Sequence, residues 1–126
     1  MYSKYEAIYL RSIKNVNLFD SEIYGFACGY DPVPTRFALV VDSLIKSQNK
    51  KGIFDLISDP IPARMLFGLH GINELCKKGI LLTDREKLIV RSAMNRDGKV
   101  QTCGGCSRDY DSIQAEVKEF NCLLEL

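Results

Sequence analysis

Hydrophobic residues recur at helical spacing through most of this chain, and most clearly over residues 59–79. The apolar stripe of this segment consists of Ile61, Met65, Leu69, Ile72 and Cys76, widened by Leu66 and Leu75. Asp59 suits an N-cap and Pro60 a first turn, while Gly79 suits the left-handed position after the last turn. Because few polar positions remain, we expect this helix to contact neighbours on more than one side.

Two glycines, Gly68 and Gly71, lie inside this central helix and share one face because they are three residues apart. Each costs a helix about 1 kcal/mol relative to alanine. Without side chains they allow another backbone to approach closely. We interpret them as packing positions for a bulky neighbour, in preference to a ligand site.

The same periodicity predicts further helices, near residues 4–15, 20–28 and 31–48, with two turns or a packed loop at 51–58. The capping box Thr83-Asp84-Arg85-Glu86 opens another helix, whose apolar positions are Leu88, Ile89, Val90, Ala93 and Met94. Only residues 99–103 alternate as a strand does. The last helix is predicted from the stripe Tyr110, Ile113, Val117, Phe120 and Leu124.

These elements predict a single all-α domain over residues 1–126. Its six to seven helices would stack as antiparallel hairpins in a HEAT-like array, with at most one short β segment near residues 99–103. A repeat supports the array, because residues 31–37 (DPVPTRF) match residues 59–65 (DPIPARM) in kind at every place. Two explanations are open: duplication of one helical unit, or convergence of two unrelated segments on Asp-Pro, a sequence that starts a helix well.

The repeat places Arg36 and Arg64 in the first turns of their helices, where the helix dipole disfavours a cation. Two explanations are open. Each arginine pairs with a nearby carboxylate, or the two form a patch for an acidic partner. On the second explanation Arg36 and Arg64 are the predicted protein-binding residues.

Composition and charge argue against several classes of function, among them nucleic-acid binding and membrane spanning. A net charge of +1 argues against a surface that tracks nucleic-acid phosphates. No apolar run reaches the length of a membrane span, and the first residues lack the continuous apolar stretch of a secretory signal. Five cysteines without an export signal predict a cytoplasmic protein with reduced thiols. Of these, Cys28, Cys76 and Cys122 are expected to pack as small core hydrophobes.

One motif carries possible chemistry, the C-x-x-C formed by Cys103 and Cys106. A structural zinc site needs two more ligands at suitable spacing, and a redox dithiol is usual in a βαβ setting. We therefore predict no cofactor and interpret the motif as a glycine turn, with zinc or thiol chemistry as the alternative. His70 is interpreted as structural, although Glu74, four residues on, could orient it.

The run PARMLFGLHGINEL (62–75), followed by VQTCGGC (100–106), resembles small bacterial HEAT-like helical-repeat proteins of unassigned function. The resemblance implies a helical stack and no particular activity. Together with the lack of a catalytic motif, it leads us to expect a non-enzymatic protein-binding module with a protein partner. An immunity protein that neutralises a bacterial toxin is the concrete hypothesis. The alternative is a zinc- or thiol-dependent protein built on Cys103 and Cys106.

Overall fold

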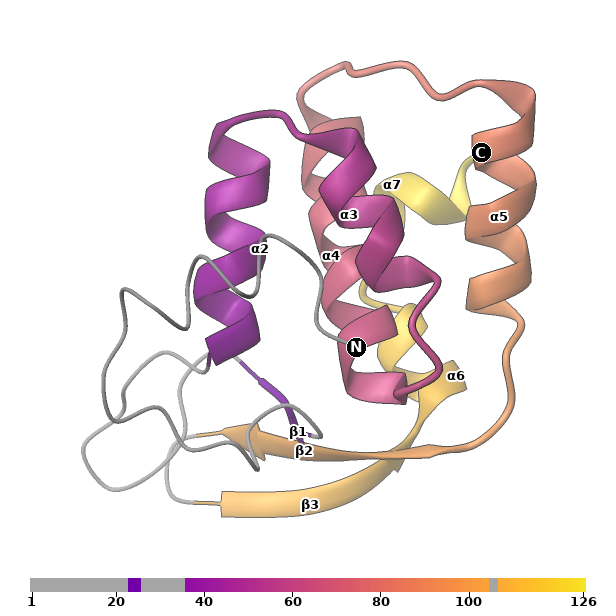
Figure 1. The fold of residues 1–126 in the computed structure, drawn as a ribbon. Coiled ribbons are helices and arrows are strands. Elements are labelled where there is room, and N and C mark those ends of the chain that lie inside the picture. Colours follow the sequence, from indigo (N-terminus) through magenta and orange to yellow (C-terminus); the bar gives the residue numbers. More distant parts are fainter. Residues whose placement is uncertain (1–22, 26–35, 105–106) are drawn as a thin grey trace.

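The computed structural model describes residues 23–25, 36–104 and 107–126. These contain three strands and six helices (Figure 1). In chain order the elements are β1 (Ile23–Tyr24), α2 (Arg36–Lys46), α3 (Lys50–Ile57), α4 (Pro62–Lys77), α5 (Asp84–Met94), β2 (Lys99–Gly104), β3 (Ser107–Ser112), α6 (Ile113–Val117) and α7 (Asn121–Leu124). The helix predicted over residues 4–15 lies outside the described residues.

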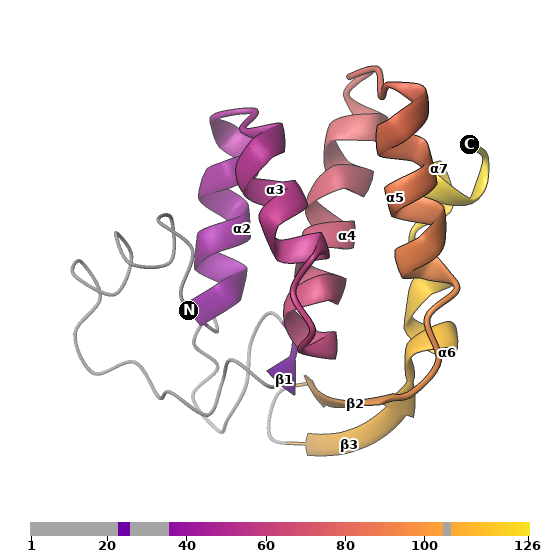
Figure 2. The same ribbon diagram turned by 45° about the vertical axis from the view of Figure 1, so that its right-hand side comes forward.

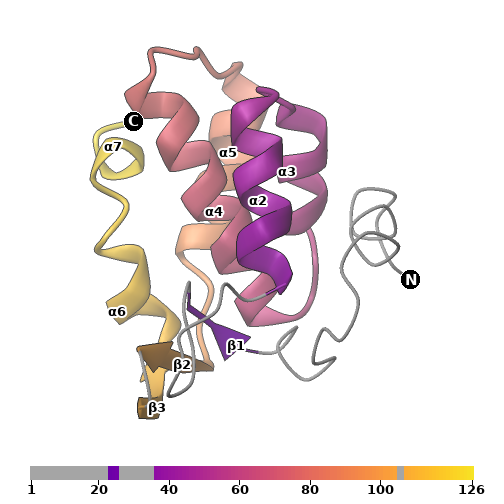
Figure 3. The same cartoon turned by 90° about the vertical axis from the view of Figure 1, so that its left-hand side faces the viewer.

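Helix α4 is the centre of the domain, as its apolar sequence predicted. It packs against α2 and α3 on one side and α6 and α7 on the other, as Figure 3 shows. Most of its side chains are buried, and its polar residue Asn73 is only 2% exposed. Gly79 has the predicted left-handed backbone, with φ of 85°. The start differs from the prediction, because Ile61 is the N-cap and Asp59 lies two residues before it.

The all-α prediction is wrong, because a three-stranded mixed sheet in the order β1–β2–β3 lies beneath the helices (Figure 1). Strands β1 and β2 are parallel, with Ile23 opposite Gln101. Strands β2 and β3 are antiparallel, with Lys99 opposite Ser112. The sheet packs against the third described helix, α4, so the domain is α/β.

Two predicted helices overlap these strands. Ile23 and Tyr24, expected within a helix over 20–28, form β1, as their β-branched and aromatic side chains favour. Tyr110 was expected to begin the last helix but belongs to β3. That helix starts later because the Ser112 side chain accepts a bond of 3.0 Å from the Ala115 N–H and so caps α6.

The HEAT-like array is wrong as well. The strand pair over residues 99–112 interrupts the helical succession, and α4 is surrounded by elements of both kinds. The matching phrases also lead into unlike helices, since α2 packs on the flank of α4 while α4 is the core. Most of the first phrase, residues 31–35, lies outside the described residues. The residues that the structure describes therefore contain no second copy of the α4 unit.

The two glycines of α4 lie where other helices pack on it, Gly68 against α3 and Gly71 against α2 and α3. An added Cβ at Gly68 would lie 2.7 Å from the Ile57 backbone nitrogen and 3.0 Å from the Ile53 carbonyl oxygen. At Gly71 it would meet side chains, with Cγ2 of Val41 at 2.8 Å. This confirms that the glycines admit a close neighbour.

The substitution Gly68→Ala is therefore expected to destabilise the protein, although alanine is normally the better helix residue. Overpacking against backbone should lower the free energy of unfolding by roughly 1–3 kcal/mol in urea denaturation. Gly71→Ala is the matched control. It should lose less stability than Gly68→Ala does, because the neighbours of Gly71 are side chains that can shift. A Gly68→Ala protein as stable as wild type would contradict the close packing of α3 on α4.

Candidate functional site

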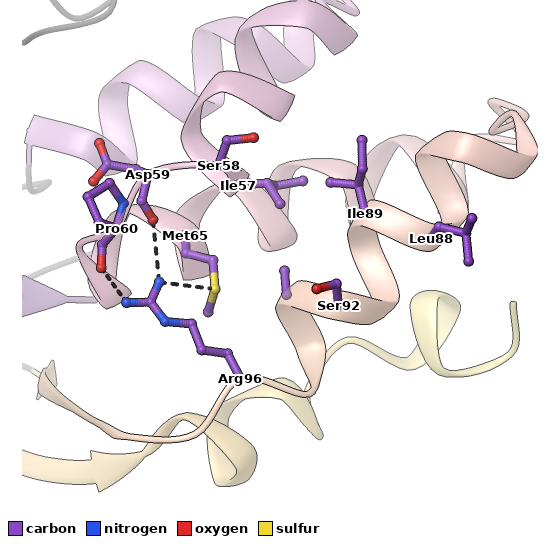
Figure 4. Close-up of a pocket in the computed structure, with 10 residues that line it drawn as sticks. Ile57, Ser58, Asp59, Pro60, Met65, Leu88, Ile89, Ser92 and Arg96 are labelled. Atoms are coloured by element: carbon purple, nitrogen blue, oxygen red, sulfur yellow. Dashed lines mark hydrogen bonds between the residues drawn. The ribbon is translucent and has the colours of Figure 1, made fainter.

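The largest cavity we describe is a surface groove of about 560 Å³, lined by the last residue of α3 and the loop after it, by Met65 of α4, by one face of α5 and by Arg96 just beyond α5. We call it the α3–α5 groove. Its lining residues are Ile57, Ser58, Asp59, Pro60, Met65, Leu88, Ile89, Ser92, Ala93 and Arg96. Figure 2 shows α4 between α3 and α5, and Figure 4 shows the side chains of the groove.

The groove exists because α5 has more apolar surface than the core takes up. Of its apolar residues, only Val90 and Met94 are buried. Leu88 is 64% exposed and Ile89 is half-buried, and both line the groove. The stripe predicted for this helix is therefore divided between the core and an open surface. Contiguous apolar surface rimmed by polar residues marks interaction sites, and Leu88 and Ile89 contribute to a groove of that kind here.

Polar bridges join the two walls of the groove at both ends. At the start of α3 and α5, Lys50 Nζ lies 2.9 Å from Glu86 Oε1 and 3.4 Å from the Leu81 carbonyl oxygen. At the other end, Arg96 donates to the carbonyl oxygens of Asp59 and Pro60 (Figure 4). The two helices therefore run in the same direction, held together at their ends, with the apolar residues between.

Glu86 also belongs to the predicted capping box, which the structure confirms. Its carboxylate accepts from the Thr83 N–H at 2.8 Å, and its own N–H donates to Thr83 Oγ1 at 3.1 Å. Burial disfavours the charged form of Glu86, but the bonds from Thr83 and Lys50 outweigh it and lower the pKa of this carboxyl.

Because the pKa of Glu86 is lowered in the folded state, the contribution of this carboxylate to the free energy of unfolding depends on pH. The contribution is complete above the pKa that glutamate has in the unfolded chain, and it is lost as pH falls through the lower pKa of the folded state. An NMR titration should show this carboxyl titrating below the ordinary glutamate value, and Lys50→Met should raise its pKa. An ordinary pKa in the wild-type protein would contradict the bridge.

Of the predicted protein-binding residues, Arg64 lies inside the protein. It is 9% exposed, its Nη1 lies 3.2 Å from Asp59 Oδ2, and its guanidinium stacks 4.8 Å from the Phe37 ring centroid. For Arg64 the first explanation therefore holds: it pairs with a nearby carboxylate, that of Asp59. Arg36 begins α2, and its side chain lies outside the described part of the structure. The two-arginine patch stays a prediction.

The expectation of reduced cysteines is wrong for Cys76 and Cys122, which form a disulfide between α4 and α7. Their Cα atoms are 6.1 Å apart, within the range that a disulfide spans. The spacing of 46 residues gave no local signal of the bond. Cys103 lies in β2 and is disulfide-bonded too. Cys28 and Cys106 lie outside the described residues.

The remaining candidates for acid–base or metal chemistry are His70 with Glu74, the carboxyl pair Glu116 and Asp111, and any cluster of metal-ligating side chains. Burial lowers the pKa of His70, and Glu74, its candidate partner, bonds Lys77 at 3.2 Å. Burial, followed by a hydrogen bond with Asp111, raises the pKa of Glu116, but neither carboxyl lines any cavity described here. Among the described residues, no three His, Cys, Asp or Glu side chains are grouped so that they could hold a metal ion.

Comparison with known proteins gives no independent guide, since no family model, curated protein or solved structure matches this chain. Function therefore has to be inferred from geometry. Sequence reasoning had not singled out the groove or Arg96. The only available signal was an apolar stripe on α5 wider than a peripheral helix needs.

Proposed function

We propose that this protein is a non-enzymatic protein-binding module and that the α3–α5 groove is its binding surface. The observation that carries the proposal is the exposed apolar face of α5, where Leu88 is 64% exposed beside the buried Met65 and Ile57. Several lining residues, Ser58, Pro60 and Ser92, are exposed too. The groove is thus open along its side, which favours a protein partner over an enclosed small molecule.

The hypothesis of an immunity protein that neutralises a bacterial toxin stays a more specific form of this proposal. It depended partly on an all-helical architecture, which the sheet removes as support. What remains is a small domain with an open apolar groove. A binding partner encoded beside this chain and blocked in its activity by it would support the hypothesis, whereas a partner without toxic activity would contradict it.

For the alternative, a zinc or thiol protein, the disulfide of Cys103 disfavours zinc, because a zinc ligand needs a free thiolate. A thiol protein would have to reduce this disulfide before Cys103 could act as a nucleophile. Metal analysis of the purified protein, with Cys103→Ser beside it, tests the alternative. Stoichiometric zinc that is lost in the variant would reinstate it.

The cysteines also indicate the cellular compartment in which the protein is found. None of the helices in the described residues combines the length and apolarity needed to cross a membrane. Disulfides persist mainly in oxidising compartments, so Cys76–Cys122 favours such a compartment over the predicted cytoplasm. Alkylation of the protein in intact cells tests this. Labelling of Cys76 and Cys122 without prior reduction would instead support the cytoplasm.

The binding surface can be tested with a substitution that fills it. A photo-crosslinking residue at Ser92, in the groove, should capture the partner in cells that produce the protein. The same residue at Arg85, an exposed position of α5 that lines no described cavity, should not. Ser92→Trp should then weaken binding of that partner by about 30-fold or more, as loss of a hot spot worth about 2 kcal/mol does.

Arg85→Trp adds the same bulk outside the groove and should leave the dissociation constant unchanged. Equal unfolding midpoints of the two variants would show that neither effect comes from misfolding. If Ser92→Trp binds the partner as tightly as Arg85→Trp does, the groove is not the binding surface.

A further inference from the structure

We infer that the α3–α5 groove takes an amphipathic helix of the partner protein, whose bulky apolar side chain enters between α3 and α5 and whose carboxylate pairs with Arg96. This inference depends on the proposed function and adds the chemistry of the partner. It follows from three features: the charge at the end of the groove, the direction of its walls and the composition of its lining.

The charge comes from Arg96, which follows the last turn of α5. Its Nη1 lies 3.4 Å from the Asp59 carbonyl oxygen and 3.7 Å from Met65 Sδ, and its Nη2 donates to the Pro60 carbonyl. Among the described residues no carboxylate lies within ion-pair distance of it. Figure 4 shows the guanidinium reaching across the end of the groove.

The carboxylate of Asp59, the acid whose carbonyl oxygen Arg96 bonds, is already engaged elsewhere. Its Oδ1 accepts from the Ile61 N–H at 2.9 Å, and its Oδ2 lies 3.2 Å from Arg64. The carboxylate thus faces the start of α4, and only the carbonyl of this residue faces Arg96. Arg96 is a positive charge held in place by neutral acceptors. A guanidinium fixed in this way favours an incoming carboxylate, because little conformational freedom remains to be lost.

The walls of the groove favour a helix as the occupant. Helices α3 and α5 run in the same direction, with the bridges of Lys50 and Arg96 at opposite ends. The lining residues of α5 recur at helical spacing from Leu88 to Ala93, which is a length of about 8 Å at the rise of an α-helix, and Arg96 lies just beyond the end of this helix. Apolar grooves between helices receive amphipathic helices through anchors spaced three or four residues apart.

The lining explains where the apolar anchor would enter. On the α5 side, the small residues Ser92 and Ala93 leave room between Ile89 and Arg96. On the opposite wall Ile57 points toward Ile89 (Figure 4). An apolar side chain at this level would contact Ile57, Met65 and Ile89, with Arg96 one helical turn away. The partner helix should therefore carry an acidic residue three or four positions from its anchor.

The test uses a displayed library of helical peptides, selected on the whole protein and counter-selected on Ser92→Trp. Enriched peptides should share a bulky apolar residue with Asp or Glu three or four positions away. Arg96→Gln should weaken their binding at least tenfold. Replacing the acidic residue of the peptide by lysine should weaken binding to wild type and restore it to Arg96→Glu, a rescue that a merely structural role of Arg96 would not give.

The outcomes separate this inference from the proposed function. Peptides that compete with the partner for the groove, but lack an acidic residue and bind Arg96→Gln equally well, overturn the inference and leave the function standing. Peptides that bind Ser92→Trp and wild type alike overturn both. A protein that sediments as a dimer, and as a monomer after Ser92→Trp, would make a second copy the occupant and overturn the inference.

Discussion

Phe67→Ala is expected to lower the free energy of unfolding by about 3–5 kcal/mol, as removal of a buried aromatic ring does. Phe67 lies in the middle of α4 and is completely buried. Its ring centroid lies 4.9 Å from that of Tyr24 in β1, edge to face, and 6.3 Å from that of Phe37 in α2. The ring therefore joins the sheet and α2 to the central helix, and the loss should affect both attachments.

Urea denaturation followed by circular dichroism measures this change. Leu88→Ala is the matched control, because Leu88 is 64% exposed and its replacement should change stability by no more than about 0.5 kcal/mol. A loss below about 1 kcal/mol for Phe67→Ala would mean that this ring is not enclosed as described, since measured costs of such substitutions start near 3 kcal/mol.

Removing the disulfide by Cys76→Ala with Cys122→Ala should cost about 4 kcal/mol. A bond that closes a loop of this length restricts the unfolded chain by about that amount. The bond also holds α7 against α4, where Asn73 Oδ1 accepts from the N–H groups of Cys122 and Leu123 at 3.1 and 3.3 Å. Both contacts fix the same short helix, which contributes the buried Leu123 to the core.

The double variant and the wild type should be compared with and without a reducing agent. Reduction should destabilise the wild type by at least as much as the substitutions do, whereas the variant should respond only through the disulfide of Cys103. Asn73→Ala measures the contribution of the hydrogen bonds from α7 alone, because it leaves the disulfide intact and removes only the buried acceptor. A double variant as stable as wild type would contradict the pairing of Cys76 with Cys122.

The sequence predicted the helical part of the fold because its signals there are local. The stripe of α4, the left-handed Gly79 and the capping box at Thr83 are all set by neighbours within a few residues. The same is true of α3, whose first turn is capped by Asn49 Oδ1 accepting from the Gly52 N–H at 3.0 Å. Such bonds depend on residue type and spacing, which a sequence displays directly.

The sheet was missed because its partners are far apart in the chain. Ile23 pairs with Gln101, which lies in the segment whose alternation predicted a short strand, but the two residues of β1 alone give no such signal. In β3, the spacing of Tyr110 to Ile113 and Val117 coincides with a helical stripe, although Ser112 divides the strand from α6. Tertiary pairing decided the structure of these segments, as it often does where local propensity is weak.

The candidate site was missed for a related reason. Arg96 acts on backbone carbonyls more than thirty residues away, and carbonyl groups carry no sequence signal. Arg64, by contrast, was singled out because its position in a first turn is unusual, and the structure pairs it with Asp59. Unusual residues in a sequence thus identified internal contacts here, while the groove arises from how three helices meet.

The central claim is that the α3–α5 groove binds the partner, and backbone amide chemical shifts test it most directly. On titration of labelled protein with the captured partner, or with the tightest selected helix, the largest changes should fall on residues 57–59 and 88–96. Ser92→Trp should remove those changes. Changes centred on α2 or on α7, with residues 88–96 unaffected, would contradict the account.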